Sequence, residues 1–291
     1  MALGRSAATG LAILNLAACH AAGVLDSHGP VSAAERLILL DATAIMLVVV
    51  APVIALTLGF AWWYRAGNRH AAYDPEWAYS GRIELVVWSI PAMVVILLGG
   101  VAWIGSHDLD PAVKLESAAG SRPVRIQVVS LDWKWLFIYP DENVAAVNEL
   151  VVPAGASLEF ALTSATVMNA FFVPQLGSQI YTMPGMTTHL NLRADESGDY
   201  PGISSHYSGD GFSDMRFVVH AVSPADYQQW LEHTRGEPAA LDAASYADLA
   251  RASSNVTPQL YGKVDPMMLE HILQTSTHIR QTDQVQPAAP P

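Results

Sequence analysis

The chain has 291 residues, of which 51% are hydrophobic and only 14% are charged, and its formal net charge is −12. Soluble domains usually carry about a quarter charged residues, so this composition predicts a membrane protein with one globular domain beside its membrane segments. The negative charge argues against a nucleic acid partner. The single cysteine, Cys19, excludes an intrachain disulfide and any metal cluster that needs two thiolates from this chain.

The N-terminal stretch has the pattern of a secretory signal. Arg5 precedes the apolar run LAILNLAA, which is too short to cross a hydrocarbon core of about 30 Å, and Cys19 follows directly after small residues. A cysteine in this position resembles a bacterial lipobox. We therefore expect a lipoprotein signal peptide over 1–18, an acylated Cys19, and a periplasmic N-terminal segment over 19–36. The alternative is an uncleaved helix that buries Cys19.

Two long apolar runs follow, and each is long enough for a spanning helix. They predict a transmembrane hairpin over 37–104, with helices at 37–64 and 83–104. The short connection between them carries Arg65, Arg69 and Arg82, which predicts that it is cytoplasmic. Both outer ends, and everything after the second helix, are then periplasmic. Asp41, inside the first run, is given no role.

After the second apolar run, the sequence pattern changes twice. Residues 105–222 contain short alternating or apolar segments separated by Pro, Gly, Asn and Asp, which predicts a β-sandwich or Greek-key barrel. Residues 223–280 contain helix-like segments, and 281–291 end in QPAAPP, the composition of a disordered tail.

One predicted loop has the spacing of a metal site without most of its ligands. GISSHYSGDGFSDM, residues 202–215, places Ser204, Ser208, Phe212 and Met215 at intervals of four, four and three. Cys, Cys, His and Met at these positions would suit a soft metal. Only Met215 is of a ligating type, and its side chain suits a sandwich core equally well.

A helix hairpin before an exported β-sandwich, this loop, SLDWKWLFIYP and NAFFVPQLGSQIYTMPGM together resemble subunit II of the haem-copper terminal oxidases. The resemblance implies a cupredoxin-like domain. In the cytochrome c branch that domain holds two coppers, through positions that fall here on Ser204, Ser208, Phe212 and Met215 and, for an earlier His, on Asn169. The departures at four of these positions point to the copper-less, quinol-oxidising branch. His206 stands where the copper branch has a Glu that contacts Mg²⁺, and it is given no role.

The resemblance implies a function for the complex rather than catalytic residues in this chain. We expect subunit II of a proton-pumping ubiquinol oxidase in a bacterial inner membrane, with haems and copper in subunit I and none in this chain. Subunit I, further small subunits and the lipid bilayer are the expected partners, and cytochrome c is not. The alternatives are a cytochrome c oxidase subunit and a free-standing lipoprotein of cupredoxin fold that binds a partner.

Two sets of residues receive roles from the same resemblance. Glu84, at the cytoplasmic start of the second helix, is expected at the mouth of a proton path of subunit I. A carboxylate that stabilises the helix N-terminus is the alternative. Trp133 and Trp135 match an aromatic cluster that passes electrons in the copper branch, and here we expect them to serve packing and docking to subunit I.

Overall fold

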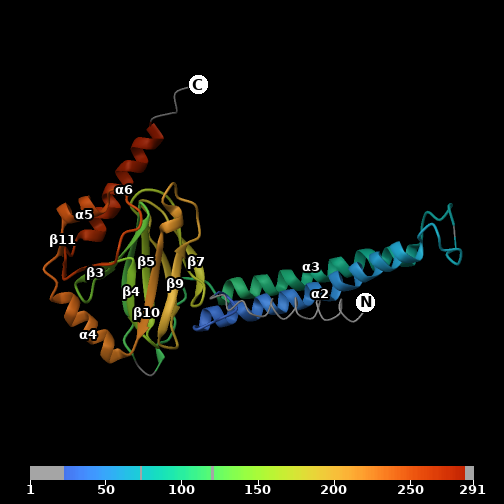
Figure 1. Cartoon of the computed structure of the whole chain (residues 1–291), viewed down its shortest axis with the longest axis horizontal. Helices are drawn as coiled ribbons and strands as arrows, with labels where there is room; N and C mark the ends of the chain where they lie inside the picture. The colour runs from blue at the N-terminus through green and yellow to red at the C-terminus, as the bar shows by residue number, and fades with distance from the viewer. Residues whose placement is uncertain (1–22, 73, 119–120, 286–291) are drawn as a thin grey trace, which may run out of the picture. The chain divides into compact units, whose positions relative to one another are not determined.

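The structure, a computed structural model, describes residues 23–72, 74–118 and 121–285, so Cys19 and the predicted signal peptide lie outside the described residues. The chain divides into two compact units (Figure 1). One is residues 34–110, and the other joins the residues before 34 to those after 110.

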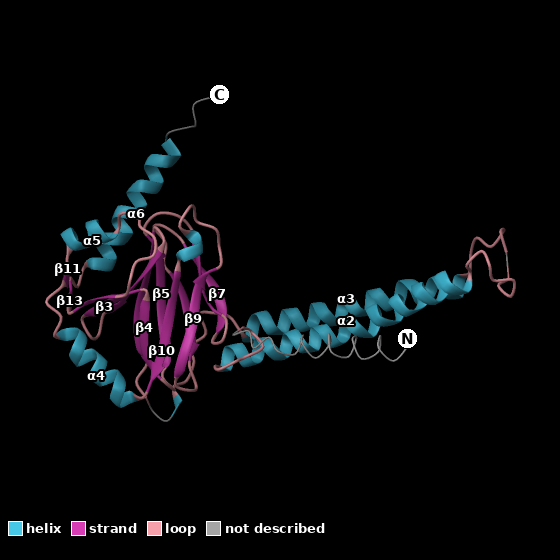
Figure 2. Ribbon diagram, in the orientation of Figure 1, coloured by secondary structure: helices cyan, strands magenta, loops and turns pink. Residues whose placement is uncertain are grey.

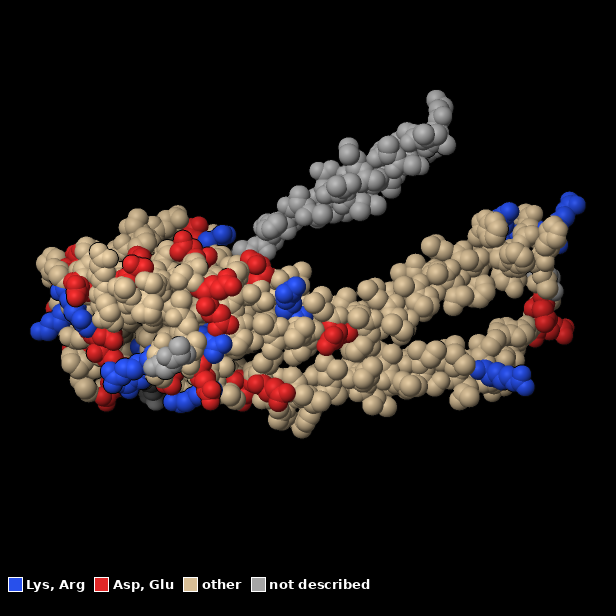
Figure 3. Space-filling model, turned by 90° about the horizontal axis from the view of Figure 1, so that it is seen from below, with Lys and Arg blue, Asp and Glu red and all other residues tan. Residues whose placement is uncertain are grey.

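The first unit is a pair of long apolar helices, α2 (Pro30–Trp63) and α3 (Gly81–Asp108). The first four residues of α2 belong to the other unit. Their most apolar windows have mean hydropathies of 2.6 and 2.4, and no residue of either window is buried, so both helices are long and apolar enough to cross a membrane. Figure 3 shows the middle of both helices almost free of charged side chains. Gly105 marks a close approach, since a β-carbon there would lie 2.8 Å from Ile38 Cδ1.

Both helices are longer than the apolar runs that predicted them. Hydropathy locates the part of a helix that suits lipid, but a helix continues through polar turns as long as its backbone hydrogen bonds do. Pro30 opens α2, and proline suits this position because its fixed φ fits the first helical turn. The helices themselves are Pro30–Trp63 and Gly81–Asp108, and the membrane-spanning parts at 37–64 and 83–104 stay a prediction.

The second unit is a cupredoxin-like β-sandwich, which confirms the predicted fold class (Figure 2). Its ten main strands are β1 (Val124–Leu131), β2 (Lys134–Tyr139), β3 (Val144–Val147), β4 (Glu149–Pro153), β5 (Ser157–Ser164), β6 (Asn169–Val173), β7 (Gly177–Thr182), β8 (Thr188–Arg193), β9 (Gly198–Ser204) and β10 (Arg216–Val222). One sheet has the order β12-β3-β2-β1-β5-β8 and the other β4-β10-β9-β6-β7. The pairs β1–β5 and β4–β10 are parallel, so each sheet is mixed rather than wholly antiparallel.

The core between the sheets is aromatic. Trp135 is fully buried, and its ring lies edge-on to Phe171 and Phe217, with centroids 5.5 and 5.6 Å away. Phe171 and Phe217 stack on one another at 5.0 Å. Edge-to-face and offset rings of this kind add to the stability that burial alone supplies.

The C-terminal region contains the expected helices, together with three short strands in its described part. Its elements are α4 (Pro224–Arg235), β11 (Ala240–Leu241), α5 (Ala243–Leu249), β12 (Gln259–Tyr261), β13 (Lys263–Val264) and α6 (Met268–Val285). β12 pairs with β3 and extends the six-stranded sheet, while β11 and β13 form a small sheet of their own. Strands of two or three residues are too short to show a periodicity in the sequence. α6 also runs to Val285, past the residue at which the tail was predicted to begin; residues 286–291 lie outside the described part.

This region covers the outer face of the six-stranded sheet. Tyr246, Met268 and Ile272 pack with Leu136 and Ile138 in a second apolar cluster. As a result β2 is buried along its whole length, on both faces, which explains why its sequence KWLFIY does not alternate.

Candidate functional site

The predicted ligand positions meet at one end of the five-stranded sheet. Asn169 is the first residue of β6 and Ser204 the last of β9, and these strands are neighbours. Ser204 Oγ donates to Asn169 Oδ1 at 3.1 Å and lies 3.2 Å from the carbonyl oxygen of His206. Asn169 and Ser204 are 1% and 4% exposed, so the two groups satisfy one another away from water.

The second half of the loop returns to the same place. Ser208 Oγ lies 3.9 Å from the sulfur of Met215, and the carbonyl of buried Met215 accepts from the backbone N–H of Ser204 at 3.2 Å. Phe212 opens the short 3₁₀ helix η2 (Phe212–Asp214), and its ring contacts Tyr207 at 5.6 Å. Hydrogen bonds therefore join Asn169, Ser204, Ser208 and Met215, while a separate ring contact holds Phe212.

Trp133 holds the loop from the side. Its indole N–H donates to the carbonyl of Ser208 at 3.0 Å, and its backbone is in the left-handed region at φ 66°. Gly209 has φ 107°, a conformation that favours glycine. A β-carbon on Gly211 would lie 2.4 Å from the Trp133 ring, so this glycine allows the ring to approach the backbone.

The three glycines of this loop serve different purposes. Gly209 alone among Gly202, Gly209 and Gly211 has a positive φ. A β-carbon at Gly202 would lie 2.1 Å from the ring of Phe217, so Gly202, like Gly211, makes room for an aromatic side chain rather than for a turn.

Comparison with known proteins identifies the family. Residues 137–222 match the family described as "Cytochrome C oxidase subunit II, periplasmic domain", and residues 235–275 match the "COX Aromatic Rich Motif". Cytochrome bo(3) ubiquinol oxidase subunit 2 of Pseudomonas aeruginosa is 48% identical over 255 residues, which cover 88% of this chain and 76% of that one. The protein of the same name from Pseudomonas putida is 45% identical over 90% of this chain and 83% of that one, and ubiquinol oxidase subunit 2 of Acetobacter aceti is 43% identical over 89% and 84%.

The chain belongs to the ubiquinol oxidase subunit 2 family. The resemblance to subunit II of the haem-copper quinol oxidases is thereby confirmed.

In this family member the loop does not offer the donors of a dinuclear copper centre. Two hydroxyls, an amide and a thioether occupy four of the predicted positions, and all four are neutral at pH 7. Copper sites of this type need thiolates and imidazoles, and the fifth position is Phe212, which has no lone pair. The rings of His206 and Tyr181 lie perpendicular to one another, with their centroids 5.9 Å apart. Over the part of the chain that the structure describes, no three His, Cys, Asp and Glu side chains lie close enough to hold a metal.

The two tryptophans of the DWKW motif occupy different environments. Trp135 belongs to the aromatic core, and its indole N–H has no partner among the described residues. Trp133 is half-buried against the loop. A docking role for either remains a prediction.

Lys134 is a functional candidate that sequence reasoning missed. It is 1% exposed, and its ammonium donates to the Arg251 carbonyl at 2.8 Å, to Ser253 Oγ at 2.6 Å and to the Asp132 carbonyl at 3.3 Å. Burial lowers the pKa of Lys134. The side chain therefore connects β2 to the aromatic-rich region of residues 235–275. In the sequence, only the absence of alternation in KWLFIY indicates that this lysine is buried.

Glu84 and Asp41 belong to the helix unit. Glu84 lies in the first turn of α3, where its backbone N–H donates to the Ser80 carbonyl at 3.0 Å and its side chain is exposed. Asp41 is an exposed residue of α2.

Proposed function

We propose that this chain is subunit 2 of a proton-pumping ubiquinol oxidase, a complex that oxidises ubiquinol and reduces oxygen to water. The observation that carries this proposal is the hydrogen bond between Asn169 and Ser204. These two residues occupy positions at which the cytochrome c branch has copper ligands. Where a copper-binding relative needs an imidazole and a thiolate, these two side chains satisfy one another. Electrons from ubiquinol then enter subunit I, where we place the haems and copper, without passing through this chain.

The chain's own contribution is structural, with one proposed role in proton uptake. Its apolar hairpin packs in the membrane against subunit I and further small subunits, and its sandwich lies in the periplasm. Glu84 is exposed in the first turn of α3, as a carboxylate at the mouth of a proton path would be. No residue of this chain acts on ubiquinol or oxygen.

The localisation follows from the same organisation. We propose that the protein resides in a bacterial inner membrane, that residues 1–18 are removed as a signal peptide, and that Cys19 is acylated. The support is the lipobox-like sequence and the cluster of Arg65, Arg69 and Arg82 between the helices, which favours a cytoplasmic hairpin loop and periplasmic outer ends.

The deciding experiment is metal and substrate analysis of the complex isolated in mild detergent through a tag on this chain. The proposal predicts oxidation of ubiquinol but not of reduced cytochrome c, haem in the complex, and the single copper of the oxygen-reducing site in subunit I. Two further coppers per complex, with cytochrome c oxidation, would identify the rival cytochrome c oxidase subunit. Isolation of this chain without any haem protein would favour the free-standing lipoprotein.

A further inference from the structure

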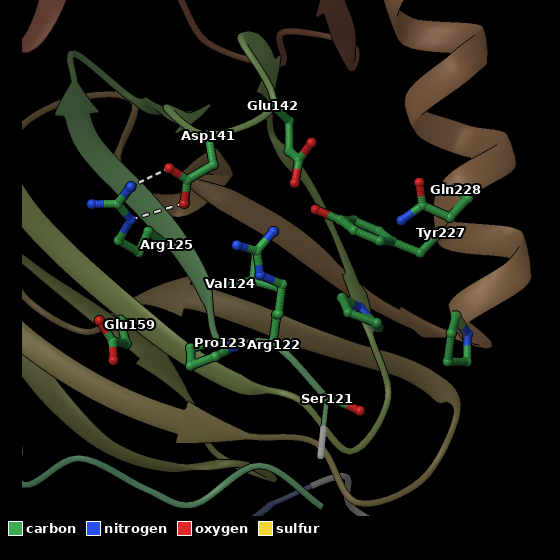
Figure 4. A pocket seen from close by; sticks show the side chains of 12 residues that line it. Ser121, Arg122, Pro123, Val124, Arg125, Asp141, Glu142, Glu159, Tyr227 and Gln228 are labelled. Atoms are coloured by element: carbon green, nitrogen blue, oxygen red, sulfur yellow. Dashed lines mark hydrogen bonds and ion pairs between the residues drawn. The ribbon is translucent and has the colours of Figure 1, made fainter. Parts of the chain in front are cut away.

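A hollow of about 890 Å³ lies on the sandwich at the opposite end of β1 from the DWKW motif. It is lined by residues around the start of β1, by the turn after β2 and by the first turn of α4 (Figure 4). None of these residues belongs to residues 202–215, the loop that has the spacing of a metal site.

The carboxylates of this hollow are already neutralised. Asp141 accepts from Arg125 Nε at 2.8 Å, Glu142 pairs with Arg235 at 2.8 Å, and Glu159 pairs with Lys114 at 3.0 Å. The hydrogen bond from Arg125 and the charge of Arg122 both hold the pKa of Asp141 below its usual value. Each negative charge in the hollow therefore has its own cation.

Arg122 also lines the hollow, and only its charge, without a direct contact, acts on Asp141. Within the described part of the chain its guanidinium has neither an ion-pair nor a hydrogen-bond partner, although it lines the hollow. The lining holds Arg122 and Arg125 beside three carboxylates, and two of these carboxylates are paired by Arg235 and Lys114 from outside the hollow. The first turn of α4 also borders the hollow, but Ser223 caps this helix and Asp226 in the same turn offsets its partial positive charge.

Tyr227 supplies an unused donor at the same place. Its side chain is 4% exposed, and its hydroxyl has no hydrogen-bond partner in the described structure. Figure 4 shows this hydroxyl pointing between Glu142 and Arg122. Burial raises the pKa of Tyr227 well above its ordinary value, so the group is a donor at every physiological pH. A buried hydroxyl without a partner is costly, and a ligand acceptor would satisfy it.

We propose that this hollow is a binding site for a phosphate group, held between the Arg122 guanidinium and the Tyr227 hydroxyl. Arginine recognises phosphate through several N–H groups at once. The hollow is larger than a phosphate ion, so the group can be carried on a lipid headgroup or arrive as free phosphate. The two sources differ only in what fills the remaining space.

The test is a titration of the full-length chain in detergent and phosphate-free buffer, followed by calorimetry. One arm uses inorganic phosphate, and the other a short-chain phosphatidylglycerol below its micelle concentration. We expect binding in at least one arm, weakened several-fold by Arg122→Gln, which removes the charge, and by Tyr227→Phe, which removes only the hydroxyl. Tighter binding of the phosphatidylglycerol assigns the site to a headgroup, and equal or tighter binding of inorganic phosphate assigns it to the free ion.

Arg216→Gln is the matched control, because it removes the same group from β10, at a residue that does not line the hollow. It should bind both probes like the unaltered chain. Near-UV circular dichroism verifies that the aromatic core of each variant is folded. The proposal is overturned if neither probe binds the unaltered chain, or if folded Arg122→Gln and Tyr227→Phe variants bind with unchanged affinity.

Discussion

Single residues keep the loop of residues 202–215 in place, and Gly211 is one of them. A β-carbon there would lie 2.4 Å from the Trp133 ring, which is itself fixed by its hydrogen bond to the Ser208 carbonyl. Gly211→Ala should therefore lower the free energy of unfolding by about 1–3 kcal/mol, the usual cost of overpacking. Thermal unfolding of the full-length chain in detergent, followed by near-UV circular dichroism, measures the change.

The control for this substitution is Gly198→Ala, at the start of β9. There a β-carbon would meet the Tyr200 side chain, with the hydroxyl nearest at 3.4 Å, an ordinary contact. Equal stability of the two variants would mean that the Trp133 ring does not rest on the loop.

Glu84 allows a functional test at the same scale. If it feeds a proton path, Glu84→Gln should slow ubiquinol oxidation several-fold while haem content and assembly stay intact, since the amide cannot exchange protons. Glu84→Asp should lose less, because a carboxylate survives close to the original position. Oxygen consumption of the purified complex across a range of pH is the measurement.

Glu76→Gln is the matched control for the proton path, because Glu76 is another exposed carboxylate between the two helices. It should leave turnover unchanged. Normal turnover of Glu84→Gln at every pH would reduce Glu84 to a charge that stabilises the helix end.

At the scale of whole elements, the C-terminal region is part of the sandwich because β12 extends one sheet, while α5 and α6 pack on the outer face of that sheet. Tyr246 of α5 lies in this contact, and burial raises its pKa to about 12. The unfolded phenol titrates near pH 10, so the folded state holds this proton longer. The stabilisation is complete below about pH 10 and is lost as the pH rises through about 12, with a loss of about 1 kcal/mol near pH 11.

Tyr246→Phe should remove this part of the alkaline loss. The free energy of unfolding, measured in denaturant at about pH 9 and about pH 11, should fall less for the variant than for the unaltered chain. Tyr207→Phe is the control, since that side chain is 70% exposed, and it should behave like the unaltered chain. An alkaline loss that is the same in Tyr246→Phe would show that α5 does not enclose the phenol.

An element could be predicted from the sequence when consecutive residues determine it, and could not when residues far away in the chain do. The apolar runs of α2 and α3, and the alternation of most strands, are properties of consecutive residues, and they identified the hairpin and the sandwich. β12 exists because its three residues meet β3, more than a hundred residues away, and no pattern within them announces it. Lys134 is enclosed for the same kind of reason, by Arg251 and Ser253. The ligand positions could be read from spacing, but the bond between Asn169 and Ser204 needed the two strands side by side.

The loop as an element can be tested by restoring its ligands. Asn169→His, Ser204→Cys, Ser208→Cys and Phe212→His, with Met215 unchanged, should give a variant that binds close to two coppers with strong visible absorption. Asn169 and Ser204 already touch, and Ser208 already contacts Met215. Replacing the phenyl ring by the smaller imidazole should cost about 1–3 kcal/mol, which metal binding offsets because ligation energy adds to folding energy.

Copper analysis and absorption spectra of the full-length variant in detergent provide the measurement. A double variant with only Ser204→Cys and Ser208→Cys should hold copper more weakly, because it lacks the imidazoles. A folded fourfold variant that takes up no copper would show that the hydrogen-bonded frame differs from that of a metal loop.

At the scale of the whole molecule, the hairpin and the proposed lipid are two separate means of holding the sandwich at the membrane. The sequence before the described residues predicts that the mature chain begins at Cys19 and carries covalent lipid. Mass spectrometry of the intact purified chain tests this directly. Retention of Met1, or an unmodified thiol, would exclude lipidation.

Cys19→Ala then measures what the lipid contributes. Each acyl CH₂ buried in the bilayer is worth about 0.8 kcal/mol, and a single chain gives only reversible binding, whereas a spanning helix is held almost irreversibly. Because α2 and α3 are both apolar enough to span, the variant should keep its signal segment uncleaved yet stay in the membrane pellet after alkaline carbonate extraction. A chain with 37–104 replaced by a flexible linker but Cys19 intact should be far easier to release by detergent-free washing. Release of Cys19→Ala into the supernatant would mean that the hairpin does not anchor the protein, and the proposed packing against subunit I would fall with it.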